Sequence, residues 1–257
     1  MQTGVITMFD ALVLAGSGKV NDPLTEYAGV HNKTFIPIKG RPLITYILDT
    51  LASTPAVSTI IVVGPAKELE TLRQEGYNFL IANEGDTLLN NVSNAIKHAE
   101  PSRLCLVVTG DIPLLSRAAL EEFLNLCAPY DGDLYYPVLS EETCQKSYPD
   151  TKRTYVVLKE GPVTGGNIGL VNPAWFIKKK DSLELFISYR KKPLKLLRIL
   201  PLSLVLKYYL KKLSLTDLEK SLSNLLEMKA HAVLCQCAEI GLDVDKISDL
   251  EQVRKLL

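Results

Sequence analysis

The feature that most constrains this chain is an apolar run near the N-terminus that ends in a glycine loop, Asp10–Asn21, DALVLAGSGKVN. A buried strand that ends at Gly16 and Gly18 leaves backbone N–H groups at a sheet edge with no Cβ in front of them. Phosphate groups can approach such N–H groups closely, so the segment indicates a nucleotide site. It is not a Walker loop, because no Gly-Lys-Ser/Thr follows, nor the dinucleotide fingerprint, because a third glycine is missing. A strand that ends in glycine is also common in α/β proteins without such a site.

A lone lysine, Lys33, follows in the segment NKTFIPIKGRPL. We interpret it as the charge that neutralises phosphate beside the glycine loop. The alternative is an ordinary solvated lysine before a strand. His31 lies close enough in the sequence to contact phosphate as well, whereas His98 and His231 are interpreted as structural.

A second apolar run, RLCLVVTGDIPLL at Arg103–Leu115, ends on Gly110 and Asp111. Its aliphatic residues predict a central strand buried on both faces, and ligands of open α/β sheets bind outside the carboxyl ends of such strands. Asp111 is therefore expected at the functional edge, where a carboxylate is a natural ligand for Mg²⁺. The alternative is that Asp111 only caps a helix that begins near Ser116.

A third acidic segment, EIGLDVDKISDLEQV, lies near the C-terminus. Asp243 and Asp245 alternate along a short extended stretch and share one face, so either or both can face a common metal. The alternative is that they are surface residues before the last helix, with Ser248 as its N-cap and Glu251 completing a capping box.

Composition agrees with a cytoplasmic enzyme. The chain has 257 residues, of which 47% are hydrophobic, enough for a sizeable core. The 29 basic and 29 acidic side chains balance, so nothing global indicates a nucleic-acid partner. Five scattered cysteines form no disulfide framework and favour a reducing compartment, and the N-terminus does not resemble a signal sequence. Cys235 and Cys237 lack a second pair that would complete a zinc site, so we interpret them as core-facing positions of one strand.

Apolar runs alternate with helical patterns, which predicts an α/β fold with a parallel sheet and helices on both faces. Strands are expected at Ala11–Leu14, Thr59–Val63, Phe79–Ala82, Leu104–Thr109, Leu134–Pro137, Tyr155–Leu158, Ile168–Val171 and Ala232–Cys235. Helices are expected near Pro42–Ser53, Ala66–Gln74, Thr87–Ala99 and Arg117–Leu126. Asp86 is the expected N-cap of the third of these helices.

The segment Lys178–Leu213 is rich in Lys, Arg and Leu and poor in acidic residues. We favour the interpretation that this segment is a helical cap over the pocket for a second substrate, the acceptor. A basic amphipathic stretch can also make peripheral contact with an anionic membrane, and an oligomer contact or a solvated surface are further alternatives. Its apolar run Ile199–Leu206 is far shorter than the roughly 20 residues that span a bilayer.

Together these segments resemble the molybdenum-cofactor guanylyltransferase-like (MobA-like) nucleotidyltransferases, relatives of sugar-phosphate and CMP-sugar cytidylyltransferases. The resemblance covers most of the chain, is weakest over Phe176–Met228, and rests on LAGSG at Leu14–Gly18, the Lys33 segment through IPIKGRPLITYIL, TGDIPLL at Thr109–Leu115, GGNIGLVNP at Gly165–Pro173 and DVDKISDLEQVR at Asp243–Arg254. It implies one nucleotidyltransferase domain over residues 1–257. The implied fold is Rossmann-like, a mixed, mostly parallel sheet with helices on both faces and a basic, C-terminal helical insertion at about residues 176–228.

The resemblance also implies roles for individual residues. Lys33, Asp111 and Asp245 would be catalytic, and Asp111, Asp245 and Asp243 would hold Mg²⁺. The nucleotide would be bound by Leu14, Ala15, Gly16, Ser17, Gly18, Lys19, Lys33, Gly85, Asn91, Ser93 and Gly110, of which Gly85, Asn91 and Ser93 would lie beside the base. The alternative for these three residues is a plain solvated helix start. The acceptor would be bound by Gly166 and Asn167.

The implied reaction moves a nucleoside monophosphate from a nucleoside triphosphate to a small phosphorylated acceptor and releases pyrophosphate. A homo-oligomer is also consistent with the sequence, which identifies neither the base nor the acceptor.

The family loop usually carries an arginine that would fall near Asn21, and KVNDPLTEYAGVHN has none. Lys19 and Arg41 are the candidates to replace it, although a lysine does not reproduce a bidentate guanidinium on phosphate. This departure motivates one alternative, a nucleotide-binding regulatory or scaffold protein without turnover. A second is a metal-dependent glycosyltransferase that uses Asp243 and Asp245 as its metal motif.

Overall fold

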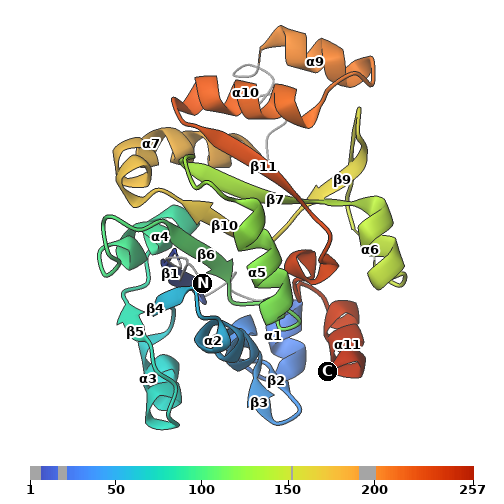
Figure 1. Cartoon of the computed structure of the whole chain (residues 1–257). Coiled ribbons are helices and arrows are strands. Elements are labelled where there is room, and N and C mark those ends of the chain that lie inside the picture. Colours follow the sequence, from blue (N-terminus) through green and yellow to red (C-terminus); the bar gives the residue numbers. More distant parts are fainter. Residues whose placement is uncertain (1–6, 17–21, 152, 191–200) are drawn as a thin grey trace, which may run out of the picture.

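A computed structural model describes residues 7–16, 22–151, 153–190 and 201–257 of the chain (Figure 1). Within these residues, nine strands form one mixed sheet in the order β5-β4-β1-β6-β10-β7-β9-β8, with β11 beside β7. This arrangement agrees with the predicted mixed α/β fold. A separate two-stranded ribbon is formed by β2 (Pro37–Ile38) and β3 (Arg41–Pro42).

One half of the sheet is parallel. Its strands are β5 (Leu80–Ala82), β4 (Val57–Val63), β1 (Phe9–Leu14) and β6 (Cys105–Thr109). The chain runs outward from β1 through β4 to β5 and then returns to place β6 on the other side of β1. Strand order therefore reverses between β1 and β6, the position at which open α/β sheets bind ligands outside the carboxyl ends of their strands.

The other half contains the antiparallel pairs. β10 (Ile168–Val171) lies antiparallel between β6 and β7 (Leu134–Ser140), and β9 (Gly161–Gly165) joins β7 to β8 (Val156–Leu158). β11 (Ala230–Cys235) pairs in parallel with β7. β11 therefore runs in the same direction as β6. Its carboxyl end, and the C-terminal residues that follow it, lie at the edge of the sheet at which β1 and β6 end.

Both faces of the parallel half are covered by helices, which explains why its strands are continuous apolar runs. Alternate residues of β1 point to opposite faces, with Phe9, Ala11 and Val13 in one hydrophobic cluster and Leu12 and Leu14 in the other. The first cluster is completed by helices α2 (Leu43–Ser53), α3 (Ala66–Gln74) and α5 (Arg117–Leu126), and the second by α4 (Leu88–Ile96) and α7 (Pro173–Arg190).

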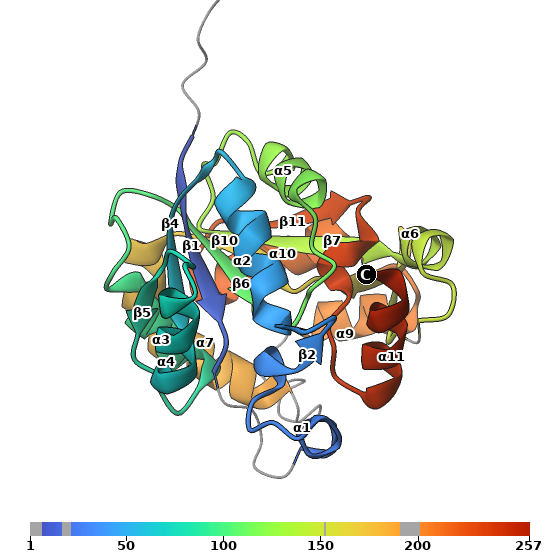
Figure 2. The same ribbon diagram turned by 90° about the horizontal axis from the view of Figure 1, so that it is seen from below.

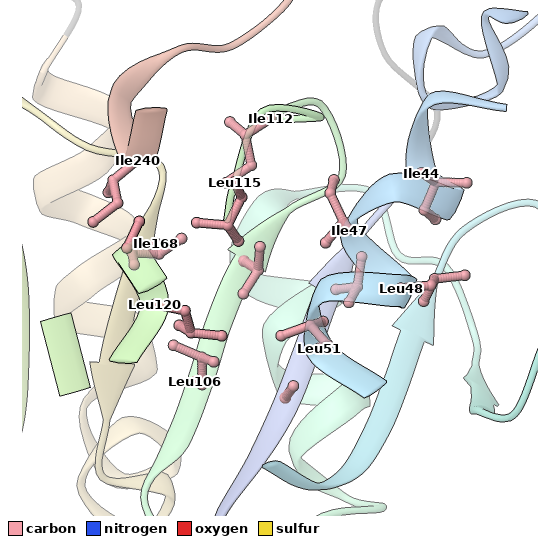
Figure 3. Packing of buried hydrophobic residues seen from close by; sticks show 14 of the residues in the cluster. Ile44, Ile47, Leu48, Leu51, Leu106, Ile112, Leu115, Leu120, Ile168 and Ile240 are labelled. Carbon is pink, nitrogen blue, oxygen red and sulfur yellow. The ribbon is translucent and has the colours of Figure 1, made fainter. Parts of the chain in front are cut away.

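Helix α2 shows how this packing follows from helical periodicity. Ile44, Ile47, Leu48 and Leu51 are spaced three and four residues apart, so they share one face of the helix. Figure 3 shows these side chains beside the sheet, in the same cluster as Leu120 of α5 and the nearby strands. The Leu43 N–H at the start of α2 donates to the Ile36 carbonyl at 3.0 Å, which joins this helix to the end of the turn that carries Lys33.

The predicted helical insertion contains α7, α9 (Leu202–Tyr209) and α10 (Leu215–Leu226). In Figure 1, α9 and α10 lie at the top of the molecule, above β11. Residues 191–200 of the predicted basic cap lie outside the described residues. In the part of the chain that the structure describes, no helix is both long and apolar enough to cross a membrane.

The remaining short elements are α1 (Pro23–Ala28), η1 (Lys33–Phe35), α6 (Glu141–Ser147) and η2 (Ala238–Gly241). In Figure 1, α1 and the last helix α11 (Ile247–Leu256) lie at the opposite end of the molecule from α9 and α10. Figure 2 shows α1, β2 and α11 grouped at this end. The Tyr27 hydroxyl of α1 donates to the Glu251 carboxylate of α11 at 3.4 Å, which joins the two helices across the sequence.

Two predicted helix starts are wrong. Thr87, not Asp86, is the N-cap of α4, because its hydroxyl accepts a hydrogen bond from the Asn90 N–H. Helix α11 begins at Ile247, so Ser248 lies inside it and is not its N-cap.

Glu251 does not complete a capping box either. The carboxylate of Asp249, two residues earlier, accepts the Lys246 N–H at 2.9 Å, which is the role predicted for Glu251. Glu251 instead accepts from Arg254.

The interpretation of the Cys-x-Cys pair is half correct. Cys235 is a buried residue of β11, whereas Cys237 lies beyond the strand as the N-cap of η2, and its thiol donates to Glu122.

The core packing leads to a stability prediction. Phe123 of α5 is fully buried, and Phe123→Ala should lower the free energy of unfolding by about 3–5 kcal/mol through lost burial and a residual cavity. Leu126→Ala on the same helix is the control, since Leu126 is 49% exposed and its truncation should cost about 0.5 kcal/mol or less. Urea denaturation measures both values. Equal losses would mean that α5 does not bury the Phe123 face.

Candidate active site

The ends of β1 and β6 are held directly together. The Gly110 N–H donates to the Leu14 carbonyl at 2.9 Å, and the Ala15 N–H donates to the Val63 carbonyl at 2.7 Å. A Cβ on Gly110 would lie 2.9 Å from the Thr34 methyl carbon and 3.0 Å from the Leu14 oxygen, so this close approach requires glycine. The structure therefore brings the predicted nucleotide-binding residues Leu14, Ala15 and Gly110 to one edge of the sheet.

Asn91 joins the glycine loop to the turn before α4. Its Oδ1 accepts the Gly85 N–H at 2.7 Å, and a Cβ on Gly16 would lie 2.6 Å from its Nδ2. Gly85, Asn91 and Gly16 are thus adjacent. Ser93 lies two positions further along α4, about 200° around the helix axis, and does not share the face of Asn91. Ser17, Gly18 and Lys19 lie outside the described residues.

Three charged side chains from distant segments meet at this edge. The Lys33 Nζ lies 2.5 Å from Asp111 Oδ2 and 2.6 Å from Asp245 Oδ1. Burial lowers the pKa of the Lys33 ammonium, but the charges and hydrogen bonds of the two aspartates outweigh it and hold that pKa above its ordinary value. Lys33 is therefore a cation held between two carboxylates. The alternative interpretation, an ordinary solvated lysine, does not agree with this position.

Asp111 does not cap the helix that follows it. The N-cap of α5 is Ser116, whose hydroxyl accepts the Ala119 N–H at 3.1 Å. Asp111 is instead buried at the sheet edge, and its Oδ1 has no hydrogen-bond partner among the described residues. A buried oxygen of this kind is costly unless something else binds it.

The carboxylates of Asp111, Asp243 and Asp245 form a set that could hold a metal ion, with one oxygen from each lying within 4.8 Å of the others. Burial, followed by repulsion from Asp245 and Asp111, raises the pKa of Asp243 to about 6. Burial opposes ionisation of Asp245 too, but the hydrogen bond and charge of Lys33 outweigh it and lower that pKa. Clustered carboxylate oxygens fit Mg²⁺, which prefers hard oxygen ligands.

The backbone around Asp245 is anchored at two points. The Val244 N–H donates to the Asp111 carbonyl at 2.9 Å, which attaches the C-terminal segment to the end of β6. The Asp249 carboxylate accepts the Asp245 N–H at 3.1 Å, so the first turn of α11 also holds this residue in place. Sequence reasoning did not assign Asp249 this role.

Asn32 is a second residue that sequence reasoning missed. It is buried, its Nδ2 donates to the Ala15 carbonyl at 2.8 Å, and its Oδ1 accepts from the Thr34 N–H and hydroxyl at 2.9 Å each. As the N-cap of η1, it links the turn that carries Lys33 to the glycine loop. The sequence signal that could have predicted this role is the residue type, since Asn directly before a short helical turn is a preferred N-cap.

We expect Asn32→Ala to lower the free energy of unfolding by about 1–3 kcal/mol, because it leaves the buried Ala15 carbonyl unpaired and removes the η1 cap. Asn94→Ala is the matched control, since the Asn94 amide also donates to a loop carbonyl, that of Asn83, but at the surface. Chemical denaturation of both variants tests the assignment. Equal stability changes would count against a buried anchoring role for Asn32.

The residues predicted to bind the acceptor lie between β9 and β10, beside the end of β6. The Thr109 N–H donates to the Asn167 carbonyl at 3.0 Å, and the Asn167 N–H donates to the Ile240 carbonyl at 2.9 Å. The Asn167 Nδ2 is buried and has no hydrogen-bond partner within the described residues. Gly166 is explained by packing, since a Cβ there would lie 2.7 Å from the Ile240 side chain.

Arg41, one candidate to replace the missing loop arginine, is engaged with residues outside the carboxylate site. Its guanidinium donates to Asp49 and, at 2.9 Å, to the Thr45 hydroxyl, and it lies over the Tyr46 ring at 4.5 Å. None of these partners belongs to the site. Lys19 and Asn21 are outside the described residues, so any role of Lys19 stays a prediction.

A cleft of about 260 Å³ opens beside the carboxylates. It is bordered by Asp243 and Asp245 on one side and by residues of the segment before β8 and of α11 on the other, including Thr151, Arg153, Thr154, Asp249 and Gln252. Apolar side chains also line it, those of Leu114, Leu242, Val253 and Leu256.

Comparison with known proteins adds a family assignment to this geometry. A family model of the MobA-like NTP transferase domain matches residues 11–229. A 2-C-methyl-D-erythritol 4-phosphate cytidylyltransferase from Clostridium kluyveri is 30% identical over 130 residues, which are 48% of this chain and 53% of that protein. The corresponding enzyme from Clostridium acetobutylicum is 27% identical over 108 residues, 39% of this chain and 47% of that protein. The chain thus spans about half the length of the curated relatives it matches.

Solved structures extend the similarity to nearly the whole chain. A hypothetical transferase from Thermus thermophilus superimposes with a TM-score of 0.83 at 33% identity, covering 95% of this chain and all of that one. A CMP:2-keto-3-deoxy-manno-octonic acid synthetase in complex with CTP has a TM-score of 0.62 at 13% identity, covering 97% of this chain and 98% of that one. At 13% identity the second similarity concerns the fold alone.

Proposed function

The chain belongs to the MobA-like NTP transferase domain family, and on this premise we propose that it transfers a nucleoside monophosphate from a nucleoside triphosphate to a phosphorylated acceptor. An acceptor phosphate oxygen attacks the α-phosphorus, the bond between the α-phosphorus and its bridging oxygen breaks, and pyrophosphate leaves. The observation that carries this proposal is the meeting of Lys33, Asp111 and Asp245 at the carboxyl ends of β1 and β6.

The donor triphosphate would bind at the glycine loop. The loop begins where Ala15 and Gly16 leave β1, and Asn32 fixes the Ala15 carbonyl relative to the turn that carries Lys33. Lys33 keeps its positive charge in this setting, so it can offset the negative charge that develops on the phosphates. No side chain of the site has to act as a covalent nucleophile, and catalysis would come from positioning and electrostatics.

Asp111, Asp243 and Asp245 are the residues that would hold Mg²⁺, and their oxygen donors suit this ion. When bound, Mg²⁺ supplies Lewis-acid polarisation and charge neutralisation of phosphate oxygens. The buried Asp111 side chain would form the inner part of this metal site. The more exposed Asp245 would contribute its carboxylate from the C-terminal segment. The acceptor would enter from the cleft that Asp243 and Asp245 border.

The experiment that tests this proposal is a pyrophosphate-release screen. Each of the four common ribonucleoside triphosphates is paired with sugar phosphates, polyol phosphates or molybdopterin, with Mg²⁺ or with excess EDTA. We expect acceptor-dependent release for one base and none with EDTA. Nucleotide binding without release across the panel would contradict the proposal and favour the regulatory or scaffold alternative, and sugar transfer from a nucleotide sugar would favour a glycosyltransferase.

A further inference from the structure

Helix α9 presents an apolar face to solvent. Leu202, Leu206 and Tyr209 are spaced four and three residues apart, so they share one face of the helix, and they are 81%, 58% and 78% exposed. We call this set the outer face of α9. Leu204 lies about 200° around the helix axis from Leu202 and is buried. The helix therefore has two apolar faces, of which only one packs against the described part of the chain.

The inner face holds α9 in a defined orientation. Leu204 belongs to a hydrophobic cluster with Val138 of β7 and Leu158 of β8. On the same helix, the Lys207 Nζ lies 2.6 Å from the Asp217 Oδ1 of α10. Because these contacts fix the helix against the sheet and against α10, the outer face cannot turn inward without breaking them.

The chain around the outer face is basic. Residues 190–213 contain eight Lys or Arg residues and no Asp or Glu. Lys207 is neutralised by Asp217, whereas Lys211 and Lys212 come directly after Leu210, the C-cap residue of α9, and both are exposed. Exposed hydrocarbon and positive charge therefore occur together at this end of the molecule, and a partner has to match both.

From this combination we propose that the outer face of α9 binds an anionic membrane surface. The side chains of Leu202, Leu206 and Tyr209 would enter the boundary between head groups and acyl chains, and Lys211 and Lys212 would lie beside lipid phosphates. Amphipathic helices with basic residues lie in the plane of this interface, where tyrosine is enriched.

Two other occupants fit the same observations less well. A second copy of the chain in a two-fold dimer would place the same basic surface on both sides of the contact, so like charges would face each other. A small molecule would need a concave site, whereas the outer face lies on the convex surface of a helix. A bilayer with anionic lipids supplies both an apolar interior and negative charge.

The proposed membrane contact is separate from the candidate active site. Among the described residues of Lys178–Leu213, none borders the cleft beside the carboxylates. In Figure 1, α9 lies at the opposite end of the molecule from α11, which does border the cleft. The contact would leave the cleft open to solvent, so this inference does not depend on the proposed function.

The first test is co-sedimentation of the full chain with vesicles of phosphatidylcholine alone or of equal parts phosphatidylcholine and phosphatidylglycerol. We expect binding only to the anionic vesicles, and a steep loss of affinity as added salt screens the charges. Combining Lys211→Gln with Lys212→Gln should weaken binding at low salt by about fivefold for each lysine. The matched control combines Lys67→Gln with Lys146→Gln, exposed lysines of α3 and α6, and should change little.

The apolar contribution is tested separately. Leu202→Ser and Leu206→Ser should each weaken vesicle binding by about tenfold, because each removes hydrocarbon that would leave water. Leu126→Ser is the matched control, since Leu126 is an exposed leucine of α5, outside the outer face. All four replaced leucine and lysine positions on or after α9 are exposed, so thermal unfolding should stay unchanged.

A tryptophan at position 209 reports the depth of insertion. The single tryptophan of the chain, Trp175, is buried, so its emission gives a constant background. In Tyr209→Trp, emission should shift to shorter wavelength with anionic vesicles and should be quenched by lipids brominated on their acyl chains. Leu126→Trp should show neither effect.

Three results would overturn the proposal. The first is no binding to anionic vesicles at low salt. The second is binding that the lysine variant weakens but Leu202→Ser and Leu206→Ser do not, which would indicate charge attraction without insertion of α9. The third is a concentration-dependent dimer in sedimentation equilibrium that Leu206→Ser abolishes, which would assign the outer face to a second copy of the chain.

Discussion

Asp111→Asn is expected to reduce nucleotidyl transfer by roughly three orders of magnitude or more. The substitution keeps the size of the side chain but removes the charge from the buried member of the carboxylate set, and a metal ion supplies several kcal/mol of transition-state stabilisation in reactions of this kind. Binding of Mg²⁺, measured by calorimetry, should weaken in parallel. The backbone hydrogen bond from Val244 to Asp111 does not depend on the side chain, so the fold should be retained.

The control is Asp181→Asn, which removes an exposed carboxylate of α7 outside the carboxylate set. This variant should transfer nucleotides at the normal rate. Asp245→Asn should resemble Asp111→Asn, because both carboxylates contact Lys33 and both belong to the proposed metal set. Normal turnover in Asp111→Asn, with the fold intact, would remove it from the site.

Lys33→Ala should lower kcat by roughly 100-fold to 1,000-fold and weaken the binding of the triphosphate. The loss of a preorganised charge aimed at developing negative charge has effects of this size. Because Lys33 is only 24% exposed and lies between two carboxylates, a solvent cation cannot reproduce its position. Steady-state kinetics together with calorimetric titration of the nucleotide separate the two effects.

Lys39→Ala is the matched control for Lys33→Ala. Lys39 is exposed in the turn between β2 and β3, a few residues along the same segment, and its removal should change neither quantity. Unchanged rate and affinity in Lys33→Ala would show that this lysine serves only to pair the two aspartates.

The sequence predicted the sheet edge well because the relevant residues directly follow buried strands. Gly16 and Gly110 end apolar runs that predict buried central strands, and the carboxyl ends of parallel strands meet at one edge. Asp111 could be placed there because it directly follows the second run, whereas Lys33 was assigned only a charge-neutralising role beside the glycine loop. The proximity of Asp245 was implied by resemblance, and the structure supplies its cause, since β11 pairs with β7 and returns the chain to that edge.

Residues that act through long-range packing could not be predicted. Asn32 is a common polar residue, and its role depends on a carbonyl seventeen positions away that comes near only after the sheet has formed. The position of Arg153 depends on its packing over Gly241, which the sequence does not reveal. Helix starts failed for a local reason, because Asp86 and Thr87 are both good caps and only the geometry of the turn selects between them.

The missing loop arginine is the main reason to ask whether this chain is an active enzyme or a nucleotide-binding protein without turnover. Arg41, one candidate to supply that charge, is held by Asp49, Thr45 and Tyr46, none of which belongs to the carboxylate site. Among the described residues, Lys33 is the cation that lies between the proposed metal ligands Asp111 and Asp245. We expect Lys33 to carry a large share of the phosphate neutralisation, alongside any contribution of Lys19, which is why its replacement is expected to have a large effect.

The most direct test of nucleotidyl transfer follows the α-phosphorus of the donor. Nucleoside triphosphates labelled with ³²P at the α-position are incubated with Mg²⁺ and with the phosphorylated acceptors of the screen. The account predicts that the label moves into the acceptor in a one-to-one ratio with released pyrophosphate, and that Asp111→Asn prevents both. Pyrophosphate-free hydrolysis, or label that stays in the triphosphate with every acceptor while the nucleotide is bound, would contradict it.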